Sequence, residues 1–377
     1  MKILFVSPLS LRFGGGGTSW LIEIAKHLKN LSNAIKVVAL DYDTGTKRIT
    51  QEDIQNVYLR GIPYQEIPLR KTFLDRIGLL MPSSNGFKRL ISYLEESDVV
   101  YFMNAHGLDL IFSIIKKIKK KHFISGIHAP LHYGSKIRDI YNSTLAKIIF
   151  KAFDSHHVLN DFYYDLLKRW RLKNIFKIPP GVDIEKFSPP EDLSFLKCPS
   201  FKVMFVGRLA KQKGIDILCR TIKKLATFKD IEFYIYGSGK HEFFIKELKS
   251  NFNNVNWYGY LPFEKIPEAY KKMHLIFMPS RQENFSATIL EALSTGLVGV
   301  VSDISGLREV IDESNGRIVS LDKEEGFSEA IVDLYNIWKR DFEKYLKMRE
   351  FSRKVCVDNY SWQKISLDME NMFKKCS

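Results

Sequence analysis

The sequence predicts an α/β protein built from two doubly wound parallel sheets, each covered by helices. Short apolar runs suited to buried strands alternate with helical patterns, and this alternation occurs twice, before and after a proline-rich connection. The length of 377 residues agrees, because a domain takes about 100–200 residues. We therefore expect two Rossmann-like domains that face each other across a cleft, where ligands of such sheets usually bind.

The first half contains five runs that fit buried strands. They are KILFVSP (2–8), AIKVVALD (34–41), DVVYFMN (98–104), KHFISGIH (121–128) and SHHVLN (155–160). A helical pattern over 19–31 follows the first run, which is the order of a βαβ unit. We interpret residues 2–8 as a strand because a signal peptide needs a longer apolar stretch and a small-residue cleavage site.

A connection over 178–200, with five prolines, separates the two halves. Helical patterns over 216–228 and 287–295 lie between the strand-like runs that follow it. These runs are FKVMFVG (201–207), IEFYIYG (231–237), NVNWYG (254–259), LIFMPS (275–280) and GVVSD (299–303). The expected domains are residues 1–183 and 184–358, followed by a C-terminal segment over 359–377.

Composition excludes several classes of protein. Apolar residues make up 45% and charged residues 27% of the chain, which is ordinary for a soluble globular protein. The four cysteines stand singly without a CxxC pair, so zinc fingers and redox motifs are unsupported and a reducing compartment fits. No apolar run reaches the ~18 residues needed to span a bilayer. We expect a cytoplasmic protein, and peripheral attachment to a membrane stays open.

Basic residues are concentrated in the first half. The net charge is +14, and residues 1–183 hold 27 Lys and Arg against 16 Asp and Glu. Two runs stand out: 116–121 holds five lysines, and 168–177 interleaves cations with aromatic side chains. Such a surface fits anionic lipid head groups, nucleic acid, a phosphorylated substrate, or simply a solvated helix face.

Four glycines, Gly14 to Gly17, separate the first strand from the first helix. Glycines let the backbone approach a ligand closely, and the N-terminus of the following helix favours an anion. We expect a phosphate or substrate contact here, with Thr18 or Ser19 as the helix cap. The spacing matches neither a dinucleotide fingerprint nor a P-loop.

The segment GRLAKQKG (207–214) follows the first strand of the second half. It places Arg208 and Lys213 at a strand end, where a planar guanidinium and a compact ammonium suit a diphosphate. The alternative from local sequence is an exposed basic loop.

Two acidic residues flank the beginning of the helix expected over 287–295. Glu283 lies just before it and Glu291 within it, so two carboxylates could reach different hydroxyls of one ligand. The backbone N–H groups of the entry loop could meet an anion. The residues of this loop are Asn284, Phe285 and Ser286. The alternative is an ordinary helix-terminal acid with a second, exposed one.

The histidines and acidic pairs of the first half give no metal-binding pattern. His128 follows a strand, where sites of such sheets collect, but the pair His128/His132 has no HExxH motif or carboxylate partner. Asp41 and Asp43 match a DxD pattern, which we interpret as chance. We therefore expect no metal ion and no cofactor.

Taken in order, the segments resemble glycosyltransferase family 4, a group with the GT-B fold, nearly from end to end. The motifs are Gly15-Gly16 with Ile24-Ala25, PPGVDIEKFSP (179–189), GRLAKQKG (207–214), ENFSATILEALSTG (283–296), VVSDISGLREVI (300–311) and YSWQKI (360–365). Each motif alone is weak, whereas their order and spacing are specific. The chain departs from the family at Pro180, where Asn is frequent, and at Ser286, where Gly is frequent.

The resemblance implies the GT-B architecture, with residues 359–377 returning as a helix to the first domain. It also implies a retaining, metal-independent transferase whose substrate is a nucleotide sugar, UDP- or GDP-linked. Arg208 and Lys213 would hold the donor diphosphate and stabilise the leaving group. Glu291 would bind the ribose hydroxyls. Glu283 would bind the transferred sugar, and the backbone of the entry loop would donate to it.

The resemblance extends to the first domain. Gly16, with Gly15 and Gly17, would face the diphosphate, and His128 would contact the 6-hydroxyl of the sugar or the acceptor. The expected catalytic residues are His128, Arg208, Lys213 and Glu283.

The sequence does not decide the identity of the acceptor, and two alternatives to the transferase function stay open. The basic first half suggests a lipid-linked or cell-surface glycan as acceptor, with an anionic membrane surface as partner. The alternatives within the fold are a non-hydrolysing nucleotide-sugar epimerase and an inactive partner subunit. No helix-turn-helix, RNA-recognition motif or zinc knuckle supports nucleic-acid binding, so we expect no nucleic-acid partner.

Overall fold

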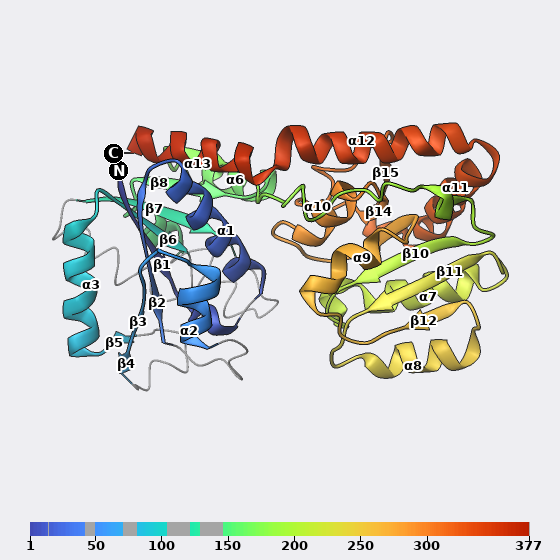
Figure 1. The fold of residues 1–377 in the computed structure, drawn as a ribbon, viewed down its shortest axis with the longest axis horizontal. Coiled ribbons are helices and arrows are strands. Elements are labelled where there is room, and N and C mark those ends of the chain that lie inside the picture. Colours follow the sequence, from blue (N-terminus) through green and yellow to red (C-terminus); the bar gives the residue numbers. More distant parts are fainter. Residues whose placement is uncertain (14, 42–49, 71–80, 104–120, 129–145, 377) are drawn as a thin grey trace. The chain divides into compact units, whose positions relative to one another are not determined.

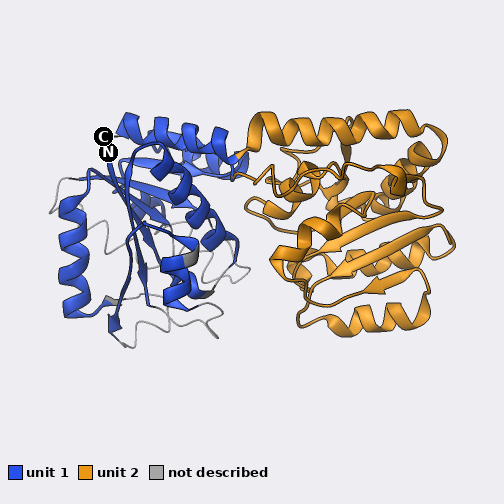
Figure 2. Cartoon of the chain, viewed as in Figure 1, with its two compact units in different colours: residues 1–180, 362–377 blue, residues 181–361 orange. Residues whose placement is uncertain are grey.

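The chain forms two compact units (Figures 1 and 2). Unit 1 comprises Met1–Pro180 and Trp362–Ser377, and unit 2 comprises Gly181–Ser361. Each junction differs by three residues from the boundary expected from the sequence. The structure is a computed structural model, and the residues that it describes are 1–13, 15–41, 50–70, 81–103, 121–128 and 146–376.

Unit 1 is built on a parallel sheet, whose described strands follow the order β3-β2-β1-β6-β7-β8-β9. They are β1 (Lys2–Ser7), β2 (Ala34–Leu40), β3 (Tyr64–Ile67), β6 (Val99–Met103), β7 (His122–Ile127), β8 (Ser155–Val158) and β9 (Ile175–Lys177). The register of β1 on β2 runs from Lys2 opposite Ala34 to Ser7 opposite Ala39. A separate antiparallel pair joins β4 (Leu69–Arg70) and β5 (Met81–Pro82).

Helices cover both faces of this sheet. Helices α1 (Gly16–Asn30) and α13 (Trp362–Cys376) pack on one face, and α3 (Ser84–Glu96) packs on the other (Figure 1). Successive residues of β1 divide between the faces, because side chains alternate along a strand: Phe5 packs with α1 and α13, and Val6 packs on the α3 side. The other helical segments among the described residues of this unit are η1 (Leu11–Phe13), α2 (Gln51–Asp53), η2 (Ile54–Tyr58) and α6 (Asp161–Arg169).

Unit 2 has the same construction, with described strands in the order β12-β11-β10-β13-β14-β15, all parallel. They are β10 (Phe201–Val206), β11 (Ile231–Tyr236), β12 (Val255–Trp257), β13 (Leu275–Met278), β14 (Val298–Ser302) and β15 (Gly316–Val319). Helices on one face are α7 (Ile215–Leu225), α8 (Glu242–Asn251) and α11 (Gly326–Arg340). On the other lie α9 (Ile266–Tyr270), α10 (Ala287–Ser294) and the end of α12 (Phe342–Tyr360). The short helices are η4 (Ser194–Lys197), η5 (Lys211–Lys213), η6 (Phe263–Lys265) and η7 (Leu321–Lys323).

The structure confirms the predicted α/β class and corrects one detail of the first helix. Each of the ten apolar runs forms a strand, and both sheets are parallel. Helix α1, however, begins at Gly16 with Gly15 as its N-cap, so Thr18 and Ser19 lie inside its first turn and the expected cap is wrong. Gly15 has φ +103, a conformation that a non-glycine cap would rarely adopt. None of the described helices combines the length and the apolar character that crossing a bilayer requires.

Candidate functional site

The turn between β10 and α7, residues 207–214, lies at the carboxyl end of an interior strand of unit 2. Gly214 closes the turn with φ +71, and a Cβ there would stand 1.9 Å from the carbonyl oxygen of Pro279. Only glycine therefore fits this position. Arg208 is exposed and forms no ion pair within the described part of the chain, whereas Lys213 is half-buried. The turn presents Arg208 and Lys213, together with Lys211, on a backbone held against the neighbouring loop.

Lys213 pairs with Glu283, which brings together two residues predicted from separate motifs. Lys213 Nζ lies 2.5 Å from Glu283 Oε1, and Ser280 Oγ donates to the same oxygen over 2.8 Å. The Glu283 side chain is only 9% exposed, so this carboxylate is fixed rather than freely solvated. Its second oxygen, Oε2, receives no hydrogen bond from the residues that the structure describes. That oxygen can accept from a ligand hydroxyl.

Arg281 and Asp216, which the sequence analysis missed, join the two loops. The guanidinium of Arg281 donates to both carboxylate oxygens of Asp216 over 2.5 and 2.8 Å. The Arg281 backbone N–H donates to the carbonyl of Gln212 over 2.8 Å. Burial is the largest single influence on the pKa of Asp216 and raises it, but the hydrogen bonds and charge of Arg281, with the hydrogen bonds from Arg220 and the backbone, together lower that pKa. The sequence contained two signals for this pair. They are an Arg two positions before Glu283 and an acidic residue in the first turn of α7.

The loop before α10 leaves the helix N-terminus without a side-chain cap. Ser286 is the N-cap residue, but its hydroxyl contacts Met278 Sδ over 3.9 Å and caps no backbone N–H. Asn284 and Ser286 are buried, and Phe285 is half-buried. The first N–H groups of α10 are thus open to an anionic or hydroxyl ligand.

A second turn supports this loop from the other side. Gly306 has φ +84, and a Cβ there would stand 2.5 Å from the carbonyl oxygen of Asn284. Glu309 Oε1 holds the turn by accepting from the Gly306 N–H over 3.2 Å and from Ser305 Oγ over 2.6 Å. The backbone of residues 284–285 therefore has little freedom to shift toward Gly306.

Glu291 lies within α10, and in the part of the chain that the structure describes no hydrogen bond or ion pair joins it to Lys213 or Glu283. The hydroxyl of Tyr270 donates to its Oε2 over 3.4 Å. Desolvation raises the pKa of Glu291 to about 7, although the Tyr270 hydroxyl and the charge of Lys186 act in the opposite direction. Hydroxyl groups that donate to this carboxylate would favour its ionised form.

In unit 1, the structure describes Gly15, Gly16 and Gly17 of the glycine run. Gly15 and Gly16 are exposed, and a Cβ on either would meet no atom within 4 Å. Gly17 is tighter, because its Cβ would lie 3.4 Å from the methyl group of Met103. The open start of α1 therefore leaves room for a ligand at Gly15 and Gly16.

His128 stands at the end of β7 in a chain of hydrogen bonds. Its Nε2 lies 2.7 Å from the Tyr101 hydroxyl, which lies 2.5 Å from Nδ1 of His157. Nε2 of His157 lies 2.8 Å from the carbonyl oxygen of Ile178. The ring of Trp20, in α1, lies 4.1 Å from the His128 ring. Burial lowers the pKa of His157 to about 4 and that of His128 well below its usual value, so both rings are neutral near pH 7.

Some predicted features lie outside the described residues: Gly14, His132, Asp43 and the lysines of 116–120. Within the described ranges, no three His, Cys, Asp or Glu side chains lie close enough to hold a metal ion.

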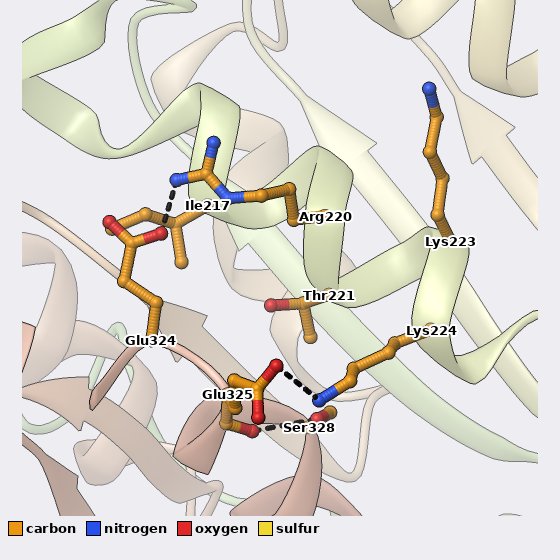
Figure 3. A pocket seen from close by; sticks show the side chains of 8 residues that line it. All are labelled: Ile217, Arg220, Thr221, Lys223, Lys224, Glu324, Glu325 and Ser328. Carbon is orange, nitrogen blue, oxygen red and sulfur yellow. Dashed lines mark hydrogen bonds and ion pairs between the residues drawn. The ribbon is translucent and has the colours of Figure 1, made fainter.

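A surface pocket of unit 2 lies between α7 and the start of α11, and none of the predicted site residues lines it (Figure 3). Its charges are paired within the protein: Arg220 with Glu324, and Lys224 with Glu325 over 3.3 Å. Lys223 at its rim pairs with Glu247 over 3.5 Å. Nothing in this pocket points to an anionic ligand.

Comparison with known proteins finds a family match in unit 2. Residues 200–336 match the family model described as glycosyl transferases group 1. The uncharacterized glycosyltransferase MJ1178 of Methanocaldococcus jannaschii is 24% identical over 100% of this chain and 99% of its own length. The UDP-Gal:alpha-D-GlcNAc-diphosphoundecaprenol alpha-1,3-galactosyltransferase of Escherichia coli is 31% identical over 48% of each chain. The chain spans about half the length of several other curated relatives that it matches.

Among solved structures, HepE of Anabaena in complex with UDP aligns with 100% of both chains at a TM-score of 0.78 and 18% identity. At this identity the likeness shows the fold alone. That fold is the GT-B architecture that the sequence motifs predict.

Proposed function

We propose that this chain is a glycosyltransferase of group 1, as the family match of residues 200–336 supports, and that it moves a sugar from a nucleotide sugar to an acceptor hydroxyl with retention and without a metal ion. The pairing of Lys213 with Glu283, beside the exposed Arg208, carries the proposal. The cations suit a diphosphate, and the carboxylate suits sugar hydroxyls. Arg208, Lys213 and Glu283 of unit 2 can thus hold both the diphosphate and the sugar, the two groups joined by the bond that breaks. The narrower assignment to family 4 stays a prediction.

The mechanism follows from the charges that develop. Cleavage of the sugar–phosphate bond leaves an anionic diphosphate and an oxocarbenium-like sugar. Fixed cations stabilise the leaving group, and the loss of one such contact costs about 10²–10³ in rate. A retaining hydrolase would use one of two carboxylates as a nucleophile. Glu283 is already engaged by Lys213 and Ser280, which favours binding over attack. The departing phosphate then takes the proton of the acceptor hydroxyl on the same face.

Other residues keep the substrate roles that the resemblance implies. Glu291 accepts from the ribose hydroxyls, and the open N-terminus of α10 donates to the donor. His128 and the glycines Gly15, Gly16 and Gly17 contact donor or acceptor. HepE holds UDP, so UDP is the first nucleotide to test, ahead of GDP.

We infer further that the acceptor is a lipid-linked glycan at the cytoplasmic face of a membrane. The relative from Escherichia coli is named for an acceptor of this kind. Exposed cations cluster at the end of α6 and in the turn after it. They are Lys168, Arg169, Arg171 and Lys173. Interfacial cations contribute about 1 kcal/mol each on anionic membranes.

Vesicle sedimentation tests the membrane inference. The protein should pellet with anionic vesicles at low salt and be released as salt rises, because surface attraction is screened. Replacing Arg169 and Arg171 by Ala should weaken this binding. Failure of the intact protein to pellet at low salt would remove the inference.

Calorimetric titration with UDP, GDP and their sugars, without metal, tests the donor site. We expect one nucleotide family to bind and the Arg208→Ala/Lys213→Ala variant to lose that binding. Lys211→Ala is the matched control, because Lys211 is an exposed cation of the same turn with no predicted role. If the intact protein bound no nucleotide, the transferase mechanism would be abandoned in favour of an inactive partner subunit.

A further inference from the structure

A chain of hydrogen bonds joins His128 to Tyr101, His157 and the backbone carbonyl of Ile178. The donor and acceptor of each bond can be assigned by starting from this carbonyl. The oxygen of Ile178 can only accept, so Nε2 of His157, 2.8 Å away, carries a proton. His157 is buried, and burial keeps the ring neutral, so its Nδ1 is unprotonated and accepts. The Tyr101 hydroxyl, 2.5 Å from that nitrogen, therefore donates its proton to His157.

This direction determines the protonation of His128. A phenol has one proton, and Tyr101 has given it to His157, so toward His128 its oxygen can only accept. Nε2 of His128, 2.7 Å away, must carry a proton and donate it. In a neutral imidazole with a proton on Nε2, the remaining nitrogen, Nδ1, is an acceptor. Within the described residues, no hydrogen bond is recorded to this Nδ1.

The packing around the chain holds it in place. Tyr101 and His157 are fully buried, so water does not compete for their hydrogen bonds. Gly126 of β7 makes room for the phenol, because a Cβ there would stand 2.0 Å from the Tyr101 oxygen. Trp20 and Tyr101 contact the His128 ring at centroid distances of 4.1 and 6.0 Å. The ring is therefore held from two elements besides its own strand.

We propose that Tyr101 and His157 are positioning residues that fix His128 as the Nε2–H tautomer, so that His128 Nδ1 accepts a hydrogen bond from a substrate hydroxyl. This inference rests on the proposed function for the identity of the ligand. It assigns His128 the role of an acceptor, and not of a cation that would neutralise the diphosphate. A hydroxyl-bearing sugar or acceptor is the ligand class that such a nitrogen selects.

The protonation state can be measured without any turnover. In protein labelled with ¹⁵N-histidine, long-range proton–nitrogen correlation spectra distinguish the two neutral tautomers, and His128→Gln and His157→Gln identify the signals. We expect both residues as Nε2–H tautomers near pH 7. A Nδ1–H tautomer or an imidazolium at His128 in the intact protein would overturn the proposal, even if nucleotide binding were as expected. The reverse outcome, correct tautomers but no nucleotide binding, would remove only the proposed function.

Two substitutions test the positioning role. Tyr101→Phe removes the acceptor, so the His128 signal should move to a mixture of tautomers, and Gly126→Ala should do the same by displacing the phenol. Tyr93→Phe, a half-buried tyrosine of α3, is the control and should leave the His128 signal unchanged. In Tyr101→Phe, kcat should fall about tenfold with the donor KM nearly constant, as for one misdirected hydrogen bond. An unchanged His128 tautomer in Tyr101→Phe would contradict the proposal.

Discussion

The two units place their candidate chemistry at the carboxyl ends of parallel strands, but by different means. In unit 2, ion pairs do this: Lys213 holds Glu283, and Arg281 joins Asp216 in the first turn of α7. In unit 1, a chain of buried neutral groups runs from Ile178 to His128. Charged loops suit a ligand that develops charge, whereas a neutral chain selects the direction of a hydrogen bond. Under the proposed function, unit 2 supplies charge stabilisation and unit 1 supplies hydroxyl recognition.

The largest effect should come from removing a cation in unit 2. Lys213→Ala removes the ammonium that we propose faces the leaving diphosphate, and it leaves Glu283 without its ionic partner. We expect kcat/KM for the nucleotide sugar, followed as released nucleotide, to fall about 10²–10³-fold. Lys211→Ala should change it little. An equal loss of kcat/KM in the two variants would show that the turn acts only through its total positive charge. The specific role proposed for Lys213 in unit 2 would then be wrong.

A smaller effect should distinguish the two glycine turns. Gly214→Ala places a methyl group against the Pro279 carbonyl at positive φ, so we expect the free energy of unfolding to fall by about 2–4 kcal/mol. Gly16→Ala adds a methyl group in open space at the start of α1, and its stability should change by less than about 1 kcal/mol.

Thermal and urea unfolding of both glycine variants measure this difference. A Gly214→Ala protein as stable as the parent would mean that the 207–214 turn is not fixed against its neighbour.

The smallest effect is a pH-dependent change of stability at Glu291. The pKa of Glu291 in the folded chain is about 7, above the usual carboxyl value. The folded state therefore favours the protonated carboxyl, and this contribution to the free energy of unfolding is complete at low pH and is lost as pH rises through about 7. Glu291→Gln removes the cost of the buried charge. We expect a gain of about 1–3 kcal/mol in the free energy of unfolding at pH 8 and little change at pH 5. Urea titrations at both pH values measure it, and an equal change at both would exclude a raised pKa.

The fold was largely predictable from the sequence, and the strands that were missed in the two large sheets share a physical reason. Strands β3, β9 and β15 were not singled out, and all three lie at the edges of their sheets. Edge strands are partly exposed and carry polar residues, as in YQEI and GRIV, so they lack the continuous apolar run of an interior strand. The strand β9 was also hidden in the basic run 168–177, which we interpreted only as a charged surface.

The site was predictable only where the signal is local. Gly214 and Gly306 stand within short motifs, and close backbone approach explains why both must be glycine. The pairs Lys213–Glu283 and Arg281–Asp216 join residues 70 and 65 positions apart, so no local pattern reveals them. The same holds for Tyr101 and His157, which look like ordinary residues of buried strands until the sheet brings β6, β7 and β8 together.

The central claim, that the two loops of unit 2 hold the donor nucleotide, can be tested by hydrogen exchange with mass spectrometry. The protein would be compared with and without the nucleotide that binds in calorimetry. The account predicts slower amide exchange in residues 207–214 and 279–291. Protection confined to the pocket between α7 and α11, with none in these two loops, would contradict it.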